Sequence, residues 1–351
     1  MHMTSHETAQ RQRIMATILE IARRLNISHS TVSRVLSGQS TTPISEETRR
    51  RVLHAAQEMG YSPNLAARSM RDSRSNLVAL FASPLAGIWS GISPDIVRKA
   101  VPVLQEHGLD AFFAFSVERN IDEIPPLPAW KYDASLILQH PTRETIDRVK
   151  VSRKPCIAIN ELIPGFSCVL SDEAEGVRQA VAHLVALGHR RIAYANATGN
   201  MHLPHYSIEE RHSAYLNVMQ DFGLAPLPGH DIRPHDGDRV EFVRQVYLSE
   251  RATAILSYDH VIAMDLFSAA SELRYRIPTD LSLISFNDAF PLERLNPPIS
   301  IINLKGNEMG ISAANALIEQ IKAGKPAPPS ITRIKPEFRE RRSTSSPRNQ
   351  A

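Results

Sequence analysis

The sequence predicts a small all-α head followed by a larger α/β region. Apolar residues recur at helical spacing between positions 18 and 36, with a turn in the middle. From residue 76 onward, short apolar runs alternate with longer helical patterns. The first 75 residues hold eleven Arg, no Lys and six acidic residues, whereas the remainder is close to neutral. At 351 residues the chain is long enough for two or three domains, and a basic head on a near-neutral body favours contact with phosphate through that head.

The first two predicted helices have the spacing of a helix-turn-helix. An apolar stripe runs from Ile18 to Leu25, and Asn26 favours the left-handed conformation that ends a helix tightly. Ser28 is suited to cap a second helix with apolar positions 32, 35 and 36. Small polar residues occupy the outward side of that helix, as suits the DNA major groove: His29, Ser30, Thr31, Ser33 and Arg34. An ordinary helical hairpin with a solvated face is the alternative.

A third helix is predicted from Ser45, its cap, to Gly60, with acidic residues in the first turn. The run at 49–51 is Arg-Arg-Arg, and phosphate contact and a solvated helix surface remain equal alternatives for it. A short helix-prone piece and a polar linker follow, up to residue 75. The first fourteen residues are polar, are expected to form a disordered arm and lack the apolar core of a secretory signal. Translation from Met1 and from Met15 both remain open.

The rest of the chain alternates in the manner of parallel sheets covered by helices, with ligands at the carboxyl ends of the strands. Strands are expected at 77–82, 110–115, 134–138, 156–159, 191–195, 231–233, 253–256, 281–286 and 300–303. Helices are expected at 172–187, 209–222, 240–248, 261–273 and 308–323. A Pro-rich stretch at 124–128 replaces or shortens one helix. Cys156 and Cys168 lie on separate predicted strands without ligand spacing, which favours two buried free thiols over a disulfide.

An enzyme and a periplasmic binding protein are the two alternatives to a DNA-binding protein. His202 and His205 with Asp236 or Asp238 resemble a metal constellation, but no HExxH motif or Cys partner accompanies them, and no nucleophile elbow or phosphate loop appears. The sequence therefore predicts no enzyme, no metal and no cofactor. A periplasmic binding protein would fit the body, but it needs an export signal and has no helix-turn-helix. No run approaches transmembrane length.

Several motifs together resemble the lactose-repressor family of bacterial transcription regulators. The head and hinge carry "TVSRVLSG" and "ISEETRRRVLHAAQEMGYSPNLAARSMRDSRSN", and the body carries "HLVALGHRRIAY" (183–194), "ISFNDAF" (284–290), "NPPISIINLKGNEMG" (296–310) and "RRST" (341–344). The resemblance covers nearly everything from Met15 to Thr344. It implies a two-lobed effector domain with the fold of periplasmic sugar-binding proteins, and a hinge helix between this domain and the head.

The resemblance divides the chain into a disordered arm (1–14), a DNA-binding domain (15–62), a hinge helix and linker (63–75), a two-lobed effector-binding and dimerisation domain (76–344) and a polar tail (345–351). His29 and Ser30 are implied to read base edges, followed by Thr31, Ser33 and Arg34. Hinge residues are implied to lie on the minor groove: Asn64, Ala67, Arg68 and Met70. Met70 stands where relatives have a Leu that wedges into a base step, and packing of Met70 on the core is the alternative.

Other positions are implied to contact the effector at the strand ends and on one helix: Trp89, Asn160, Glu161, Arg211, Tyr258, Asp259 and Asn287. Three of them depart from the family's pattern. Glu161 stands where relatives commonly have Arg, Tyr258 where they have Asn, and Asn287 where many have Asp. These departures favour an effector with a cationic or apolar portion, and a role in loops or lobe packing remains the alternative.

The sequence thus predicts a cytoplasmic, nucleoid-associated transcription regulator, most consistent with a repressor. The expected partners are double-stranded DNA with a pseudo-palindromic operator, a small sugar-like metabolite between the lobes and a second copy of the chain. No membrane partner is expected. Inducer and corepressor modes both remain open.

Overall fold

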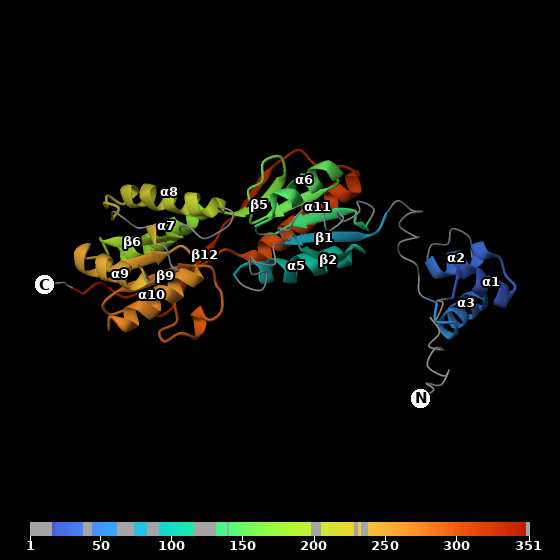
Figure 1. Ribbon diagram of the computed structural model, residues 1–351, viewed down its shortest axis with the longest axis horizontal. Coiled ribbons are helices and arrows are strands. Elements are labelled where there is room, and N and C mark those ends of the chain that lie inside the picture. Colours follow the sequence, from blue (N-terminus) through green and yellow to red (C-terminus); the bar gives the residue numbers. More distant parts are fainter. Residues whose placement is uncertain are drawn as a thin grey trace, which may run out of the picture. The chain divides into compact units, whose positions relative to one another are not determined.

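The computed structural model describes residues 16–37, 44–61, 74–82, 91–115, 131–138, 140–197, 205–227, 231–232 and 238–348. The chain separates into two compact units, Met1–Ser75 and Asn76–Ala351, and each is treated by itself (Figure 1). The Pro-rich stretch at 124–128, the loop at 38–43 and the predicted hinge helix fall outside the described residues. Along the described chain, no helix is both long and apolar enough to cross a bilayer.

Within its described residues, the first unit holds three helices, as predicted: α1 (Ile18–Leu25), α2 (His29–Ser37) and α3 (Glu46–Glu58). Asn26 ends α1 with φ of 51°, and the Ser45 hydroxyl accepts the backbone N–H of Thr48 at the start of α3. A small apolar core joins the three helices: Ile21, Ala22, Val32, Val35, Val52, Ala55 and Ala56. An ion pair of 2.6 Å between Arg24 and Glu58 also links α1 to α3. The predicted helix-turn-helix geometry is confirmed.

The second unit contains two parallel-sheet lobes. The N-terminal lobe has strand order β11-β5-β4-β3-β1-β2, and the C-terminal lobe has β12-β10-β9-β8-β6-β7, in which only β12 is antiparallel to its neighbour. The strands are β1 (Leu77–Ala82), β2 (Asp110–Phe115), β3 (Ala134–Ile137), β4 (Cys156–Ile159), β5 (Ser167–Ser171), β6 (Ile192–Ala197), β7 (Asp231–Ile232), β8 (Ala254–Ser257), β9 (Ser282–Phe286), β10 (Ser300–Asn303), β11 (Ile331–Ile334) and β12 (Glu337–Arg339). The predicted two-lobed α/β fold is confirmed.

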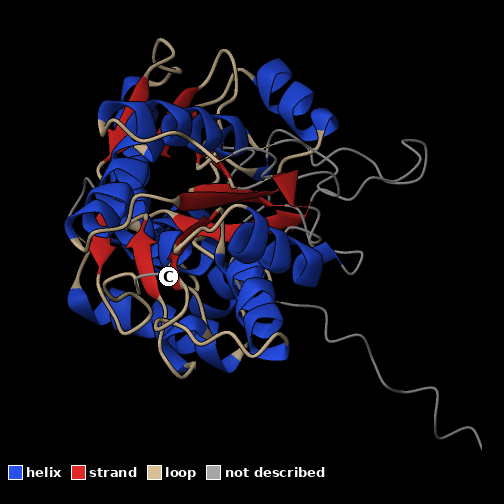
Figure 2. Ribbon diagram, turned by 90° about the vertical axis from the view of Figure 1, so that its left-hand side faces the viewer, coloured by secondary structure: helices blue, strands red, loops and turns tan. Residues whose placement is uncertain are grey.

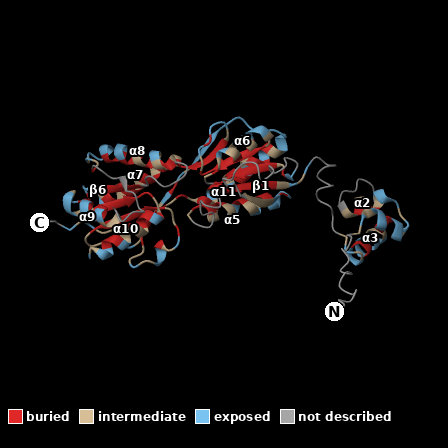
Figure 3. Ribbon diagram, in the orientation of Figure 1, coloured by how far each residue is buried: buried red, intermediate tan, exposed pale blue. Residues whose placement is uncertain are grey.

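Helices flank the strands of both lobes (Figure 2), and strands β3, β4, β5, β8 and β9 are buried at every position (Figure 3). The helices are α5 (Ser93–Glu106), α6 (Arg143–Ser152), α7 (Glu173–Ala186), α8 (Tyr206–Asp221), α9 (Asp238–Arg244), the π-helix η2 (Gln245–Ser249), α10 (His260–Glu272), the 3₁₀-helix η3 (Leu292–Arg294) and α11 (Gly306–Ala323). Helix α11 packs so closely on α5 that a Cβ atom on Gly310 would overlap the backbone oxygen of Ile96.

The chain passes between the lobes three times: from β5 to β6, from β10 through α11 to β11, and from β11 to β12. Both cysteines are buried and free, as predicted. Five elements were absent from the sequence expectations: α5, α6, η3, β11 and β12. Pro102 interrupts α5, α6 is largely polar, η3 spans three residues, and the two strands are short and mostly exposed, so none of them produces a regular apolar pattern.

Candidate functional site

Helix α2 presents a polar face on the surface of the head. His29 and Ser30 are exposed, and Thr31, Ser33 and Arg34 are half-buried. The opposite side of the helix packs Val32 and Val35 into the core of the head. The Ser28 hydroxyl accepts the backbone N–H of Thr31 at 3.1 Å, which fixes the start of the helix. All five predicted base-reading residues therefore share one helix and avoid the core.

Two of the three arginines of α3 contact other residues of the head, and the third is exposed. Arg51 donates to the backbone oxygen of Leu25 at 3.5 Å, and Arg49 lies 3.6 Å from Glu46. Arg50 is exposed. The other predicted DNA-contacting residues, Asn64, Ala67, Arg68 and Met70, lie outside the described residues, as does the predicted effector residue Trp89.

In the second unit, predicted effector residues follow the carboxyl ends of strands. Asn160 and Glu161 follow β4, Tyr258 and Asp259 follow β8, and Asn287 follows β9. The Asp259 carboxylate caps α10 by accepting the backbone N–H of Ile262 at 2.9 Å. Hydrogen bonds through His205 and Ser207 link Asn160 after β4 to Tyr258 after β8. Ligands of open parallel sheets bind at such strand ends.

Arg211 of α8 makes a buried ion pair. Its Nε donates to Oε2 of Glu173 at 2.6 Å, and its Nη1 donates to the backbone oxygen of Tyr258 at 2.6 Å. The guanidinium carbon lies 4.1 Å from the centre of the Phe286 ring and 4.8 Å from that of Tyr258. Burial disfavours the charge, but the Glu173 carboxylate outweighs it and raises the pKa of Arg211. The charge of Arg211 is thus compensated by a residue that the sequence analysis did not identify.

A hydrogen-bond chain connects the lobes through His205. Burial lowers the pKa of His205 to about 3, so the ring is neutral at pH 7. Its Nε2 lies 2.6 Å from the backbone oxygen of Asn160, which can only accept, so Nε2 holds the proton. Nδ1 then accepts from the Ser207 hydroxyl at 2.6 Å, and Ser207 accepts from the Tyr258 hydroxyl at 2.8 Å. Each of the three hydrogen bonds between Asn160 of one lobe and Tyr258 of the other therefore has a defined donor.

Glu161 lies beside two histidines. Its Oε1 accepts the backbone N–H of His140 at 2.6 Å and lies 3.7 Å from Nδ1 of His140 and 3.8 Å from Nε2 of His205. Burial lowers the pKa of both histidines, so neither compensates the carboxylate at pH 7. Burial also raises the pKa of Glu161 to about 7. Glu161 is therefore an acid without a cationic partner among these neighbours.

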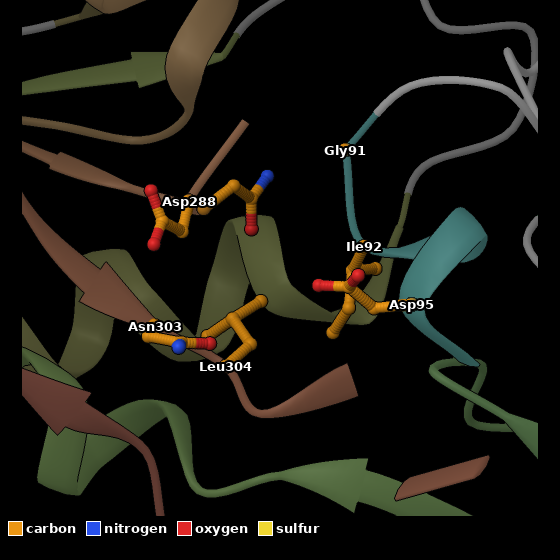
Figure 4. A pocket seen from close by; sticks show the side chains of 7 residues that line it. Gly91, Ile92, Asp95, Asp288, Asn303 and Leu304 are labelled. Carbon is orange, nitrogen blue, oxygen red and sulfur yellow. The ribbon is translucent and has the colours of Figure 1, made fainter. Parts of the chain in front are cut away.

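A small pocket of about 200 Å³, its open mouth included, lies between the lobes (Figure 4). Gly91, Ile92 and Asp95 line it from the N-terminal lobe. Strand ends of the C-terminal lobe supply the opposite wall: Asn287, Asp288, Asn303 and Leu304. A Cβ atom on Gly91 would lie 3.7 Å from Cε1 of His260 in α10, so the lobes also meet here.

Two buried polar atoms near this pocket lack a hydrogen-bond partner among the described residues: Oδ1 of Asn287 and Nδ1 of His260. Such atoms are rare in folded proteins and call for a hydrogen-bond partner beyond the described residues. Sequence reasoning identified Asn287 but missed Asp95, Asn303 and the role of His260, since Asp95 and His260 belong to no motif and Asn303 has no assigned role within the motif at 296–310. Within the described residues, no group of three or more His, Cys, Asp or Glu is placed to hold a metal ion.

The chain resembles known proteins over both units. Residues 17–64 match the family model "Bacterial regulatory proteins, lacI family", and residues 181–344 match "Periplasmic binding protein-like domain". The NTD biosynthesis operon regulator NtdR of Bacillus subtilis (strain 168) is 28% identical over 321 residues, which cover 88% of this chain and 93% of NtdR.

Two solved structures have the same fold. The lac repressor dimer bound to operator and the anti-inducer ONPF aligns with a TM-score of 0.76 and 20% identity over 94% of this chain and 99% of its own. The complex of the transcriptional regulator CelR with cellobiose aligns with a TM-score of 0.63 and 21% identity, over 93% and 99%. The two family models match the helix-turn-helix head and residues 181–344 of the two-lobed body, and the chain belongs to the lacI family of bacterial transcription regulators.

Proposed function

We propose that this regulator is a cytoplasmic repressor that binds a pseudo-palindromic operator as a homodimer and releases or tightens its hold when a small sugar-like ligand enters the cleft. In this proposal residues 15–62 bind DNA, 63–75 form the hinge and 76–344 bind the effector and dimerise. A two-fold protein requires a two-fold site, because each head reads one half-site.

The DNA-binding role is supported by helix α2, which has one apolar side in the core and one polar side at the surface. Val32 and Val35 anchor it in the core, which leaves His29 and Ser30 exposed at its beginning. These short side chains offer few direct contacts to base edges, so DNA shape contributes to recognition. Arg34 is long enough to reach guanine or a phosphate. Asn64, Ala67, Arg68 and Met70 complete the proposed interface at the minor groove, with Met70 as the wedge.

For the effector, the support comes from the polar groups at the strand ends. Asn160, Glu161, Tyr258, Asp259, Asn287 and Trp89 are the proposed ligand contacts. Arg211 positions the backbone of Tyr258 and links the effector response to the buried Glu173. CelR, a neighbour in fold, binds cellobiose, which favours a sugar-like ligand here. Ligand that binds one lobe arrangement better by about 1–3 kcal/mol would change operator affinity about 5- to 150-fold.

Genomic capture tests this proposal. The purified chain is mixed with fragments of the host genome at near-physiological salt, and the retained fragments are sequenced. A few sites that share an inverted repeat are expected. Arg34→Ala should lose these sites, whereas Arg23→Ala removes the same charge from the exposed surface of α1 and should keep them. Diffuse retention that disappears with added salt would contradict the proposal, because it reports only non-specific binding.

A further inference from the structure

The pocket between the lobes has acidic walls. Asp95 lines it from the N-terminal lobe and Asp288 from the C-terminal lobe, and no basic residue is among the seven described residues that line it. Both carboxylates have arginine partners elsewhere: Asp95 contacts the largely exposed Arg98 at 2.9 Å, and Asp288 contacts Arg341 at 2.6 Å and Arg339 at 3.0 Å. A carboxylate has about four acceptor positions. Each therefore keeps capacity for a further donor.

The unpartnered atoms near the pocket accept hydrogen bonds as well. Oδ1 of Asn287 is an acceptor only, and burial keeps His260 neutral by lowering its pKa, so its Nδ1 can accept. His260 is 8% exposed and faces Gly91, which lines the pocket. A ligand rich in N–H donors satisfies these atoms, whereas a ligand that offers only acceptors leaves them unpaired.

The described basic residues around the cleft are already engaged. Arg211 is held by Glu173. Lys305, which follows the lining residue Leu304, lies 3.1 Å from Glu308. Glu161 adds a further carboxylate near His205. An anionic ligand would have to compete with these internal acids for a cation, so the charge pattern disfavours it.

We propose that the effector is an amine-bearing sugar or polyol whose protonated nitrogen binds between Asp95 and Asp288, with Oδ1 of Asn287 as a third acceptor. This inference rests on the proposed function, in which the cleft holds the effector. The two carboxylates stand on different lobes, and the arginine partners of each lie on its own lobe, so a donor that contacts both carboxylates adds an attraction that exists only while the lobes are closed. This difference gives the ligand the preference for one lobe arrangement that control of DNA binding requires.

The test compares three probes on one ring: D-glucosamine, D-glucose and D-glucuronate, titrated calorimetrically into the full-length chain at pH 7. D-glucosamine should bind about tenfold or more tightly than D-glucose, the gain expected of one charge-assisted hydrogen bond, and D-glucuronate should bind weakest. Asp95→Asn should remove most of the preference for the amine. Asp147→Asn, the same change on the exposed face of α6, should keep it. Circular dichroism verifies that both variants are folded.

The proposal is overturned if D-glucose or D-glucuronate binds as tightly as D-glucosamine, if Asp95→Asn keeps the preference, or if D-glucosamine shows no binding at millimolar concentration. Operator capture on the same preparations distinguishes failure of the ligand assignment from failure of the proposed DNA-binding function. Inverted-repeat sites that are retained while D-glucosamine fails to bind would refute only the ligand assignment. Loss of the sites themselves would refute the proposed regulator.

Discussion

Replacing Glu161 by Gln should make the stability of the two-lobed unit less dependent on pH. Burial raises the pKa of Glu161 from an ordinary 4.5 to about 7. Between these values the unfolded chain loses its proton while the folded chain keeps it, so the free energy of unfolding falls as pH rises from about 4.5 to 7. Glutamine cannot titrate, and its amide oxygen can still accept the backbone N–H of His140.

The size of the effect follows from the two pKa values. At pH 5 the titration of Glu161 costs the native state less than about 1 kcal/mol, and at pH 8 it costs about 3 kcal/mol. The unfolding free energy of Glu161→Gln minus that of the natural chain should therefore increase by about 2.5 kcal/mol from pH 5 to pH 8. The pKa values of His140 and His205 are lowered mainly by burial, which the substitution leaves in place, so these histidines contribute little to the difference.

Urea unfolding at several pH values measures the difference. The only two tryptophans, Trp89 and Trp130, belong to the second unit, so their fluorescence reports this unit and not the head. Glu272→Gln, at an exposed position, is the matched control and should give a difference that stays the same at both pH values. A constant difference for Glu161→Gln would refute the argument, since it would mean that the carboxylate is already ionised at pH 5 in the native state.

Three further predictions address other parts of the molecule. Arg211→Ala should lower the unfolding free energy by about 3–5 kcal/mol because Glu173 is left buried without its partner, whereas the apolar pair Arg211→Met with Glu173→Leu should lose less; equal losses in urea unfolding would contradict this. Gly310→Ala should cost about 1–3 kcal/mol in the same assay, because the new methyl group would meet the Ile96 carbonyl at 2.3 Å, and an unchanged midpoint would refute the close packing. Met70→Ala should weaken operator binding in a fluorescence-anisotropy titration and leave ligand affinity of the DNA-free protein unchanged; full operator affinity would show that no side chain wedges there.

Local features of the fold could be predicted because each depends on neighbouring residues. Asn26, Ser28 and Ser45 were expected at helix ends, and all three occupy them, since cap chemistry acts within three or four residues. Strands such as β8, buried at every position, likewise have continuous apolar sequences. Helix α5 escaped prediction because Pro102 interrupts a pattern that packing on α11 nevertheless holds in place.

The contacts between the two lobes were less predictable, because the side chains involved meet only through the tertiary fold. Glu173 looks like an ordinary acidic residue at a helix start, yet it is fully buried against Arg211, 38 positions away. Asp95 belongs to no motif and Asp288 has no assigned role within the motif at 284–290, and only the packing of two lobes places them on one pocket. Glu161 was identified because it departs from the family's pattern, but its histidine neighbours could not be inferred from spacing.

The two places where the lobes meet differ in how readily they can separate. At Asn160 and His205, separation would leave a buried carbonyl and a buried imidazole N–H without partners, at a cost of about 1–3 kcal/mol for each group. At the pocket, the salt bridges of Asp95 and Asp288 each stay within one lobe, and Oδ1 of Asn287 and Nδ1 of His260 have no partner among the described residues, so opening breaks none of these bonds. Opening of the lobes therefore costs more beside His205 than beside Asp95, and a ligand that supplies donors acts at the less costly side. A small number of hydrogen bonds in the pocket can then change the relative position of the lobes while the Asn160–His205 contact stays closed.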